Sequence, residues 1–188
     1  VDKFSIAGVS IGTKQKVLIE HLNYVIRGIS SKNLIPILNC IKFELTNEGL
    51  YLLSTDNELA IKTFIPASEI DNIDIQGEIL ISGRYIYDIV RKLNNEIINI
   101  EEIIDSQVLI TTNSSSFKLN CNNVNEFPNI DLDFTDNPIL IEKSIFKTTI
   151  NQTIFATSTQ ESRPILTGIN FKINENIMEV TATDSYRL

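Results

Sequence analysis

The sequence predicts an α+β protein built from a repeated domain, on the basis of an internal repeat and of the order of its helix and strand patterns. Residues 36–60 align without a gap to residues 164–188, which lie 128 positions later, with seven identities in 25 positions. Ordinary composition gives about one or two identities by chance. The identical pairs are Pro36/Pro164, Ile37/Ile165, Leu38/Leu166, Ile41/Ile169, Phe43/Phe171, Thr55/Thr183 and Asp56/Asp184.

Three segments have the apolar spacing of amphipathic helices, namely residues 14–30, 83–93 and 143–158. The first and third are themselves 128 residues apart, because Leu18 corresponds to Phe146 and Leu22 to Ile150. The repeat therefore extends beyond its identical residues.

Short alternating or β-rich runs between these helices predict strands, and the turn at 47–49 predicts a hairpin between two of them. The expected strands are 41–45, 50–54, 59–65, 78–82, 97–103, 107–112 and 116–121, and a further strand is expected from about residue 139. An order of strand, helix and three strands, occurring twice, favours helices on one face of a mainly antiparallel sheet.

The repeat also predicts the domain organisation. Residues 1–124 are expected to form a complete domain, and the Asn-, Asp- and Pro-rich residues 125–137 a linker. Residues 138–188 are expected to be only the first half of a second domain, since a copy of equal length would end near residue 256. We expect the apolar surface of this half to be covered by another chain or left exposed.

Charge is distributed unevenly along the chain. The net charge of −8 alone argues against a nucleic-acid partner, but residues 14–32, 83–93 and 143–158 together carry +7, so that the remainder carries −15. These cations either form solvated helix faces or, if equivalent helices lie side by side, a surface that contacts phosphates without reading sequence. Because no segment approaches a membrane span and the first residues lack a signal-peptide pattern, we expect a cytoplasmic protein.

Residues suited to catalysis are scarce. His21 is the one histidine, the chain lacks a glycine-rich phosphate loop, and Cys40 and Cys121 lie in strand-like runs typical of buried thiols. We therefore expect no catalytic residue, metal or cofactor, and we interpret Thr55-Asp56 as a turn in which the Asp caps local backbone. A small α+β hydrolase or transferase stays an alternative, and it requires His21 within reach of one of the cysteines.

Five stretches, taken together in their order along the chain, resemble the bacterial DNA polymerase III beta subunit, the sliding-clamp family. They are residues 32–38 (KNLIPIL), 82–93 (SGRYIYDIVRKL), 126–128 (EFP), 163–168 (RPILTG) and 182–188 (ATDSYRL). The resemblance implies the DNA-clamp fold, in which three copies of one domain dimerise head to tail into a ring around duplex DNA. It also implies a non-enzymatic processivity factor in DNA replication. The implied partners are non-sequence-specific duplex DNA, the DNA polymerase III alpha subunit, the clamp loader and other proteins with clamp-binding motifs.

The resemblance also assigns residues. It implies that Lys32 and Arg84 contact DNA, and the basic helices add Arg27 and Arg91 to this surface. Part of a pocket for partner peptides is expected at Leu166, Thr183, Ser185, Tyr186, Arg187 and Leu188. One side of the dimer interface is expected at Tyr85, Ile89, Phe117 and Leu119. The alternative, a two-domain interaction module without a DNA role, predicts no shared orientation of the four DNA-facing cations.

Overall fold

The computed structural model describes residues 6–29, 35–94, 96–104, 106–132, 139–174 and 177–187. Contacts divide the chain into two compact units, Val1–Asp131 (unit 1) and Leu132–Leu188 (unit 2). Within the described residues, no helix is long and apolar enough to cross a membrane.

The described part of unit 1 contains one nine-stranded antiparallel sheet, in the order β4-β3-β2-β6-β9-β8-β7-β1-β5. In chain order the strands are β1 (Ile6–Lys14), β2 (Cys40–Leu45), β3 (Gly49–Thr55), β4 (Ala60–Pro66), β5 (Ile70–Ile75), β6 (Gly77–Ser82), β7 (Ile97–Ile103), β8 (Gln107–Thr111) and β9 (Ser116–Asn122). The predicted hairpin is confirmed, since the amide of Thr46 donates to the carbonyl of Gly49 at 2.9 Å between β2 and β3. Gly49 has a φ of 150°, a conformation that favours glycine.

Strand β5 has no counterpart among the predicted strands. Asp71, Asn72 and Asp74 are exposed along it, and such residues are depleted in strands. The strand nevertheless forms at the sheet edge because it pairs with β1, where Ile73 lies opposite Ile11.

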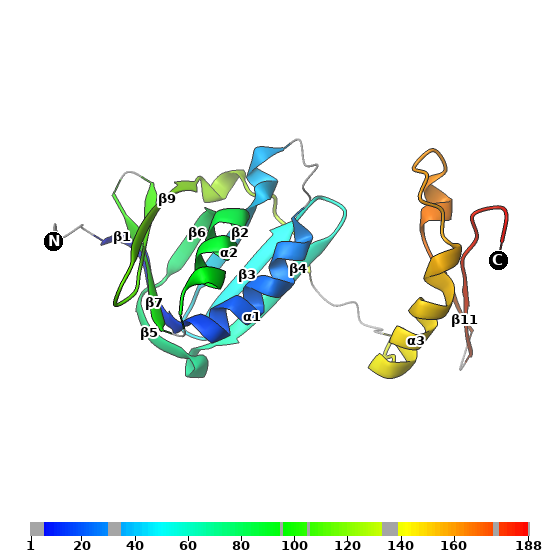
Figure 1. Ribbon diagram of the computed structural model, residues 1–188, viewed down its shortest axis with the longest axis horizontal. Helices are drawn as coiled ribbons and strands as arrows, with labels where there is room; N and C mark the ends of the chain where they lie inside the picture. Colours follow the sequence, from blue (N-terminus) through cyan, green and yellow to red (C-terminus); the bar gives the residue numbers. More distant parts are fainter. Residues whose placement is uncertain are drawn as a thin grey trace. The chain divides into compact units, whose positions relative to one another are not determined.

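Two helices, α1 (Gln15–Val25) and α2 (Gly83–Lys92), lie side by side on one face of this sheet (Figure 1). The core lies between helices and sheet, and the apolar helix residues Leu18, Leu22, Val25, Ile86 and Val90 are fully buried in it. The helices are also joined by the hydroxyl of Tyr87, which donates to Oδ1 of Asn23 at 2.9 Å. The predicted α+β architecture is therefore confirmed.

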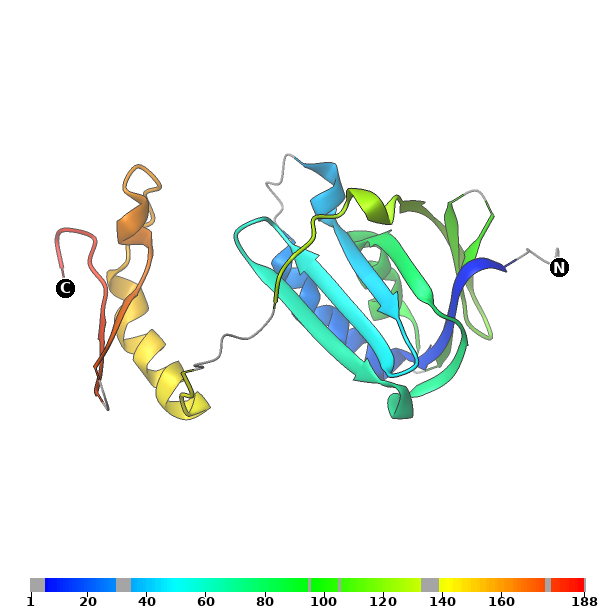
Figure 2. The same ribbon diagram turned by 180° about the vertical axis from the view of Figure 1, so that it is seen from behind.

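Part of the expected linker packs on unit 1. After the short 3-10 helix η4 (Val124–Glu126), the chain crosses the face of the sheet opposite the helices (Figure 2). Phe127 is only 8% exposed there and packs with Cys40 and Leu80. Residues 133–137 of the expected linker, and residue 138 after it, lie outside the described residues.

Unit 2 repeats the first elements of unit 1. Helix α3 (Lys143–Thr153) and the 3-10 helices η5 (Ile154–Ala156) and η6 (Pro164–Thr167) begin and end 128 positions after α1, η1 (Ile26–Gly28) and η2 (Pro36–Asn39). A hairpin of β10 (Asn170–Asn174) and β11 (Ile177–Thr181) follows, as β2 and β3 do in unit 1.

The prediction of a strand from residue 139 is wrong for residues 139–142, which the structure describes and which are not in a strand. Its counterpart β1 is held in unit 1 by pairing with β5 and β7. The positions that correspond to β5 and β7 fall after residue 188, so this segment has no such partner strands within the sequence.

The apolar residues of unit 2 are exposed where their counterparts in unit 1 are buried. Phe146 is 42% exposed and Leu18 is 0% exposed, while Phe171 is 36% exposed and Phe43 is 1% exposed. The expected apolar surface of unit 2 is thus present and uncovered in this chain.

Candidate functional sites

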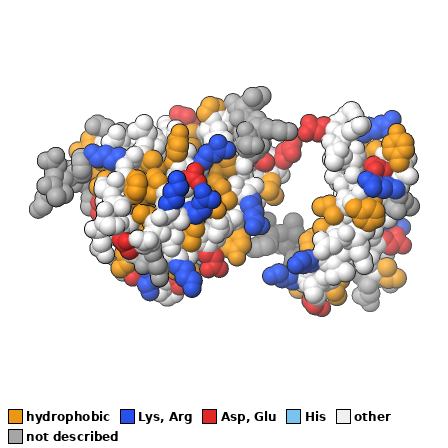
Figure 3. All heavy atoms as spheres, viewed as in Figure 1, with side chains coloured by type: hydrophobic (Ala, Val, Ile, Leu, Met, Phe, Trp, Pro, Cys, Tyr) orange, Lys and Arg blue, Asp and Glu red, His pale blue; other side chains and the backbone are white. Residues whose placement is uncertain are grey.

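Exposed cations occur on α2 and on the 3-10 helix η1 of unit 1. Arg84 and Arg91 are exposed on α2, seven residues apart and hence on one side of that helix, and Arg27 is exposed in η1 at the end of α1. Figure 3 shows Lys and Arg side chains gathered around an acidic one over α2. Lys32 lies outside the described residues.

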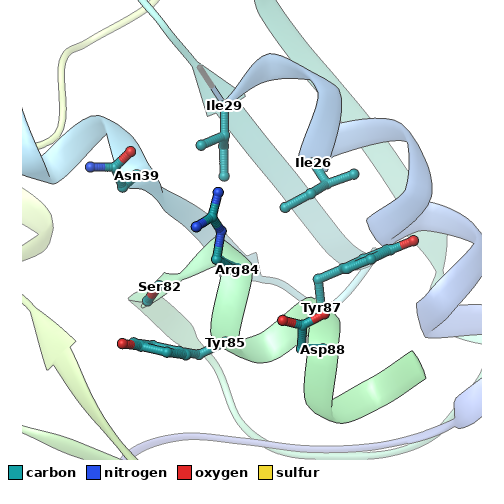
Figure 4. Close-up of a pocket in the computed structure, with 8 residues that line it drawn as sticks. All are labelled: Ile26, Ile29, Asn39, Ser82, Arg84, Tyr85, Tyr87 and Asp88. Carbon is teal, nitrogen blue, oxygen red and sulfur yellow. The ribbon is translucent and has the colours of Figure 1, made fainter. Parts of the chain in front are cut away.

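Arg84 projects into a hollow of about 580 Å³ between α2 and η1 (Figure 4). The walls nearest its guanidinium are Ile26, Ile29 and Asn39. The remaining lining residues are Ser82, Tyr85, Tyr87 and Asp88. Within the described residues neither Arg84 nor Arg27 forms an ion pair, so both charges are available to an anionic ligand.

Arg91 is more constrained. Its guanidinium is 3.3 Å from the carboxylate of Asp88 and 5.5 Å from the ring centre of Tyr87. Both members of the ion pair are about half exposed, so the pair contributes little to stability but offsets part of the Arg91 charge. Asp88 and Tyr87 were not predicted as site residues, although the three- and four-residue helix spacing places both beside Arg91.

The predicted dimer-interface residues come together only in part. Tyr85, Ile89 and Phe117 line one hollow of about 420 Å³ between α2 and the start of β9. Leu119 is two residues after Phe117 in β9 and so on the same side of the strand, where it packs against the core instead of lining that hollow. The hollow is completed by Asp88, Lys92, Leu93 and Ser115, which sequence reasoning missed.

Four of the predicted peptide-pocket residues of unit 2, Thr183, Ser185, Tyr186 and Arg187, lie in a tight turn after β11. The amides of Tyr186 and Arg187 donate to Oδ1 of Asp184 at 3.0 and 3.1 Å, and the amide of Ser185 donates to Oγ1 of Thr183 at 3.1 Å. These backbone hydrogen bonds, the one from Tyr186 first, lower the pKa of Asp184, and Arg187 contributes further. Asp184 therefore organises the turn, although it was not among the predicted residues.

This turn presents two large side chains. Tyr186 is 96% exposed, and Arg187 pairs with Asp184 at 3.0 Å while its guanidinium lies 5.8 Å from the ring centre of Phe155. Leu166 is half-buried, and its carbonyl accepts from the amide of Ser158 at 2.8 Å. Leu188 lies outside the described residues.

A hollow of about 210 Å³ in unit 2 is lined by other residues, from the end of α3, η5 and β11. They are Gln152, Thr153, Phe155, Ala156, Val180, Thr181 and Ala182. None of the predicted pocket residues that the structure describes lines this hollow, and only Thr183, Ser185, Tyr186 and Arg187 are brought together, by the turn.

The residues of the enzyme alternative do not form a reactive site. Nδ1 of His21 is 2.5 Å from Oγ1 of Thr63, while the thiol of Cys40 accepts from the side-chain amide of Asn122 at 3.1 Å. Burial raises the pKa of the Cys40 thiol and raises that of Cys121 to about 12, so both thiols are protonated and unreactive at neutral pH. No cluster of three potential metal ligands occurs among the described residues.

The Asp of Thr55-Asp56 does cap local backbone, as interpreted from the sequence. Its Oδ1 accepts from the amides of Glu58 and Leu59 at 3.1 and 2.8 Å. Thr55-Asp56 is thus a structural turn.

Two consecutive domains of one sequence family match the chain. Residues 9–131 match the family described as DNA polymerase III beta subunit, N-terminal domain, and residues 140–188 match DNA polymerase III beta subunit, central domain. The chain is 38% identical over 176 residues to the beta sliding clamp of Halalkalibacterium halodurans, covering 92% of this chain and 46% of that protein. It is 35% identical over 175 residues to the beta sliding clamp of Bacillus subtilis, covering 91% and 46%.

Solved structures show the same likeness. The DNA polymerase sliding clamp from Bacillus subtilis has a TM-score of 0.90 at 32% identity, covering 95% of this chain and 48% of that one. The DNA polymerase III beta chain from Streptococcus pneumoniae has a TM-score of 0.89 at 32% identity, covering 94% and 48%. The predicted clamp fold is confirmed, and the chain spans about half the length of these relatives.

Proposed function

Because this chain belongs to the DNA polymerase III beta subunit family, we propose that it is the N-terminal part of a sliding clamp. The proposed protein encircles duplex DNA and confers processivity on the replicative polymerase, without catalytic residues of its own. One observation carries the proposal: units 1 and 2 match consecutive domains of the one family. A role in bacterial replication would place the protein in the cytoplasm.

The charge distribution of unit 1 supports a DNA-facing helical surface. Arg27 and Arg84 are exposed and unpaired among the described residues, on helices of a protein whose net charge is −8. Such cations attract phosphates without reading bases. In a ring that holds DNA topologically, weak contacts of this kind permit sliding. We assign Arg27, Arg84 and Arg91 to this surface, with Lys32 as a further member.

We propose partners for two other surfaces. The hollow at Tyr85, Ile89 and Phe117, with Leu119 beside it, is the proposed first-domain side of the interface in a ring homodimer. The turn at 183–187, with Leu166 and Leu188, is the proposed part of a pocket for the polymerase alpha subunit, the clamp loader and other clamp-binding proteins. A related clamp from Bartonella birtlesii, solved bound to griselimycin, supports a ligand site in the family.

The domain organisation follows from the same proposal. Residues 1–124 would form the first clamp domain, residues 125–137 the linker and residues 138–188 the first half of the second domain. The exposure of Phe146 and Phe171, whose counterparts Leu18 and Phe43 are buried, supports an unfinished second core.

Retention on DNA circles tests this function. The full-length protein carrying this sequence is loaded on nicked circular DNA with its clamp loader, and the circles are then cut once. A sliding ring is retained on circles and lost after linearisation. An ordinary DNA-binding protein would stay on both forms, and an interaction module without a DNA role would be retained on neither.

Charge variants connect this result to the helical surface. Replacing Arg27 and Arg84 together with Ala should weaken retention at moderate salt, because two phosphate contacts are lost. Lys62→Ala is the matched control, since Lys62 is an exposed cation of β4 whose ammonium lies 4.4 Å from the ring centre of Tyr51. Equal effects of both changes would contradict the assignment of the DNA-facing surface.

A further inference from the structure

Gly28 and Ser54 lie close together in the core of unit 1. Gly28 ends η1, Ser54 lies in β3, and both are buried. A Cβ added at Gly28 would lie 2.4 Å from Oγ of Ser54, a distance at which one of the two must move. Glycine at position 28 therefore makes room for the hydroxyl at position 54.

The Ser54 hydroxyl forms a buried hydrogen bond to the end of α1. Ser54 Oγ donates to the carbonyl of Val25, the last residue of α1, at 2.5 Å. Val25 is the N-cap of η1, so the Ser54 hydroxyl adds a buried hydrogen bond from β3 to the carbonyl at the start of η1. It also ties β3 to the point at which α1 becomes η1.

In unit 2 the two corresponding positions carry different residues. At the positions 128 later, Gly28 becomes Ala156 and Ser54 becomes Ala182. Both alanines are buried, at 2% and 6% exposure, and both line the same small hollow. Unit 1 thus has no side chain at the first position and a hydroxyl at the second, whereas unit 2 has a methyl group at the first and no hydroxyl at the second. This exchange indicates that the sizes of the two residues are matched.

We infer that Gly28 and Ser54 are a size-matched pair that positions η1, and through it Arg27, on the basic surface. Arg27 immediately precedes Gly28 in η1, and Ile26 and Ile29 beside it line the hollow of Arg84. A shift of η1 away from β3 therefore moves both the Arg27 backbone and a wall of that hollow. The inference rests on the proposed DNA contact of Arg27.

Four forms of the full-length protein test the pairing: the wild type, Gly28→Ala, Ser54→Ala and the double variant, which copies unit 2. Gly28→Ala should lower the Tm by about 5 °C, because the added methyl group would clash with the Ser54 hydroxyl, which its hydrogen bond to Val25 keeps in place. The double variant should recover most of that loss, since the hydroxyl is gone. Simple addition of the two single effects would overturn the size-matched pair.

Positioning of Arg27 needs a second readout, the salt dependence of binding to a short labelled duplex by fluorescence anisotropy. Arg27→Ala should reduce the slope of log affinity against log salt by about 0.9, the value for one phosphate contact. Gly28→Ala should reduce it similarly, and the double variant should restore it. In an Arg27→Ala background, Gly28→Ala should have no further effect on the slope.

Two results separate this inference from the proposed function. If Gly28→Ala lowers the Tm but leaves the slope unchanged while Arg27→Ala reduces it, the pair has no positioning role and the DNA surface stands. If Arg27→Ala and Arg84→Ala both leave the affinity and the slope unchanged, the proposed DNA surface fails and the positioning role with it.

Discussion

Leu18→Ala and Phe146→Ala probe one position of the repeat in two surroundings. Leu18 is fully buried in unit 1, so its truncation should cost about 3 kcal/mol of unfolding free energy. Phe146 is 42% exposed. Of the roughly 200 Å² that a Phe buries in a core, about 80 Å² therefore still faces water, equivalent to about 2 kcal/mol of unrealised burial. Truncation of Phe146 should cost about 2 kcal/mol more in the full-length protein than in the 188-residue chain.

Amide hydrogen exchange in α1 and α3 measures both costs locally, in the 188-residue chain and in the full-length protein. Leu18→Ala is the internal control, because its surroundings lie within unit 1 and its cost should be the same at both lengths. An equal cost of Phe146→Ala at both lengths would refute the reasoning, since it would mean that later residues do not cover this face.

Three further outcomes are expected. Phe127→Ala should lower the free energy of unfolding of unit 1 by about 3 kcal/mol in urea, whereas an unchanged midpoint would mean that residues 125–131 are a free linker. Hydrogen bonds, that from the Leu59 amide first, lower the pKa of Asp56, so its stabilising effect exists at neutral pH and is lost as pH falls below about 4. The difference in Tm between wild type and Asp56→Ala should accordingly shrink toward pH 2, and a constant difference would contradict this. Native Cys40 and Cys121 should resist Ellman's reagent at pH 8 and react after unfolding, because burial raises the pKa of both thiols; fast native labelling would show them to be accessible.

Sequence periodicity located the elements that the core itself specifies. The apolar spacing of residues 14–30 and 83–93 predicted α1 and α2, whose apolar sides are the buried ones. It could not predict β5, because the acidic residues Asp71 and Asp74 are depleted in strands. This strand is stabilised instead by its pairing with β1, which a single sequence does not reveal. Likewise, the polar composition of residues 125–131 obscured the packing of Phe127 across the sheet.

The candidate sites were predictable where helix spacing applies and not where separate strands meet. Arg84 and Arg91 share a side of α2 by spacing alone. Lys92 and Ser115, by contrast, line one hollow only because α2 and the loop before β9 are brought together by the sheet. A single sequence gives no distance between such segments.

The two Thr-Asp turns of the repeat have the same backbone conformation but different side chains. In residues 55–59 and 183–187 the Thr hydroxyl accepts from the amide two residues later, and the Asp carboxylate accepts from the next two amides. The residue after the Asp has a φ of 76° in one turn and 77° in the other. The backbone is thus the same, while Asn-Glu-Leu in unit 1 corresponds to Ser-Tyr-Arg in unit 2. Because the identical Thr and Asp fix only the backbone, a binding role confined to unit 2 must depend on the side chains at 185–187 and on what surrounds them.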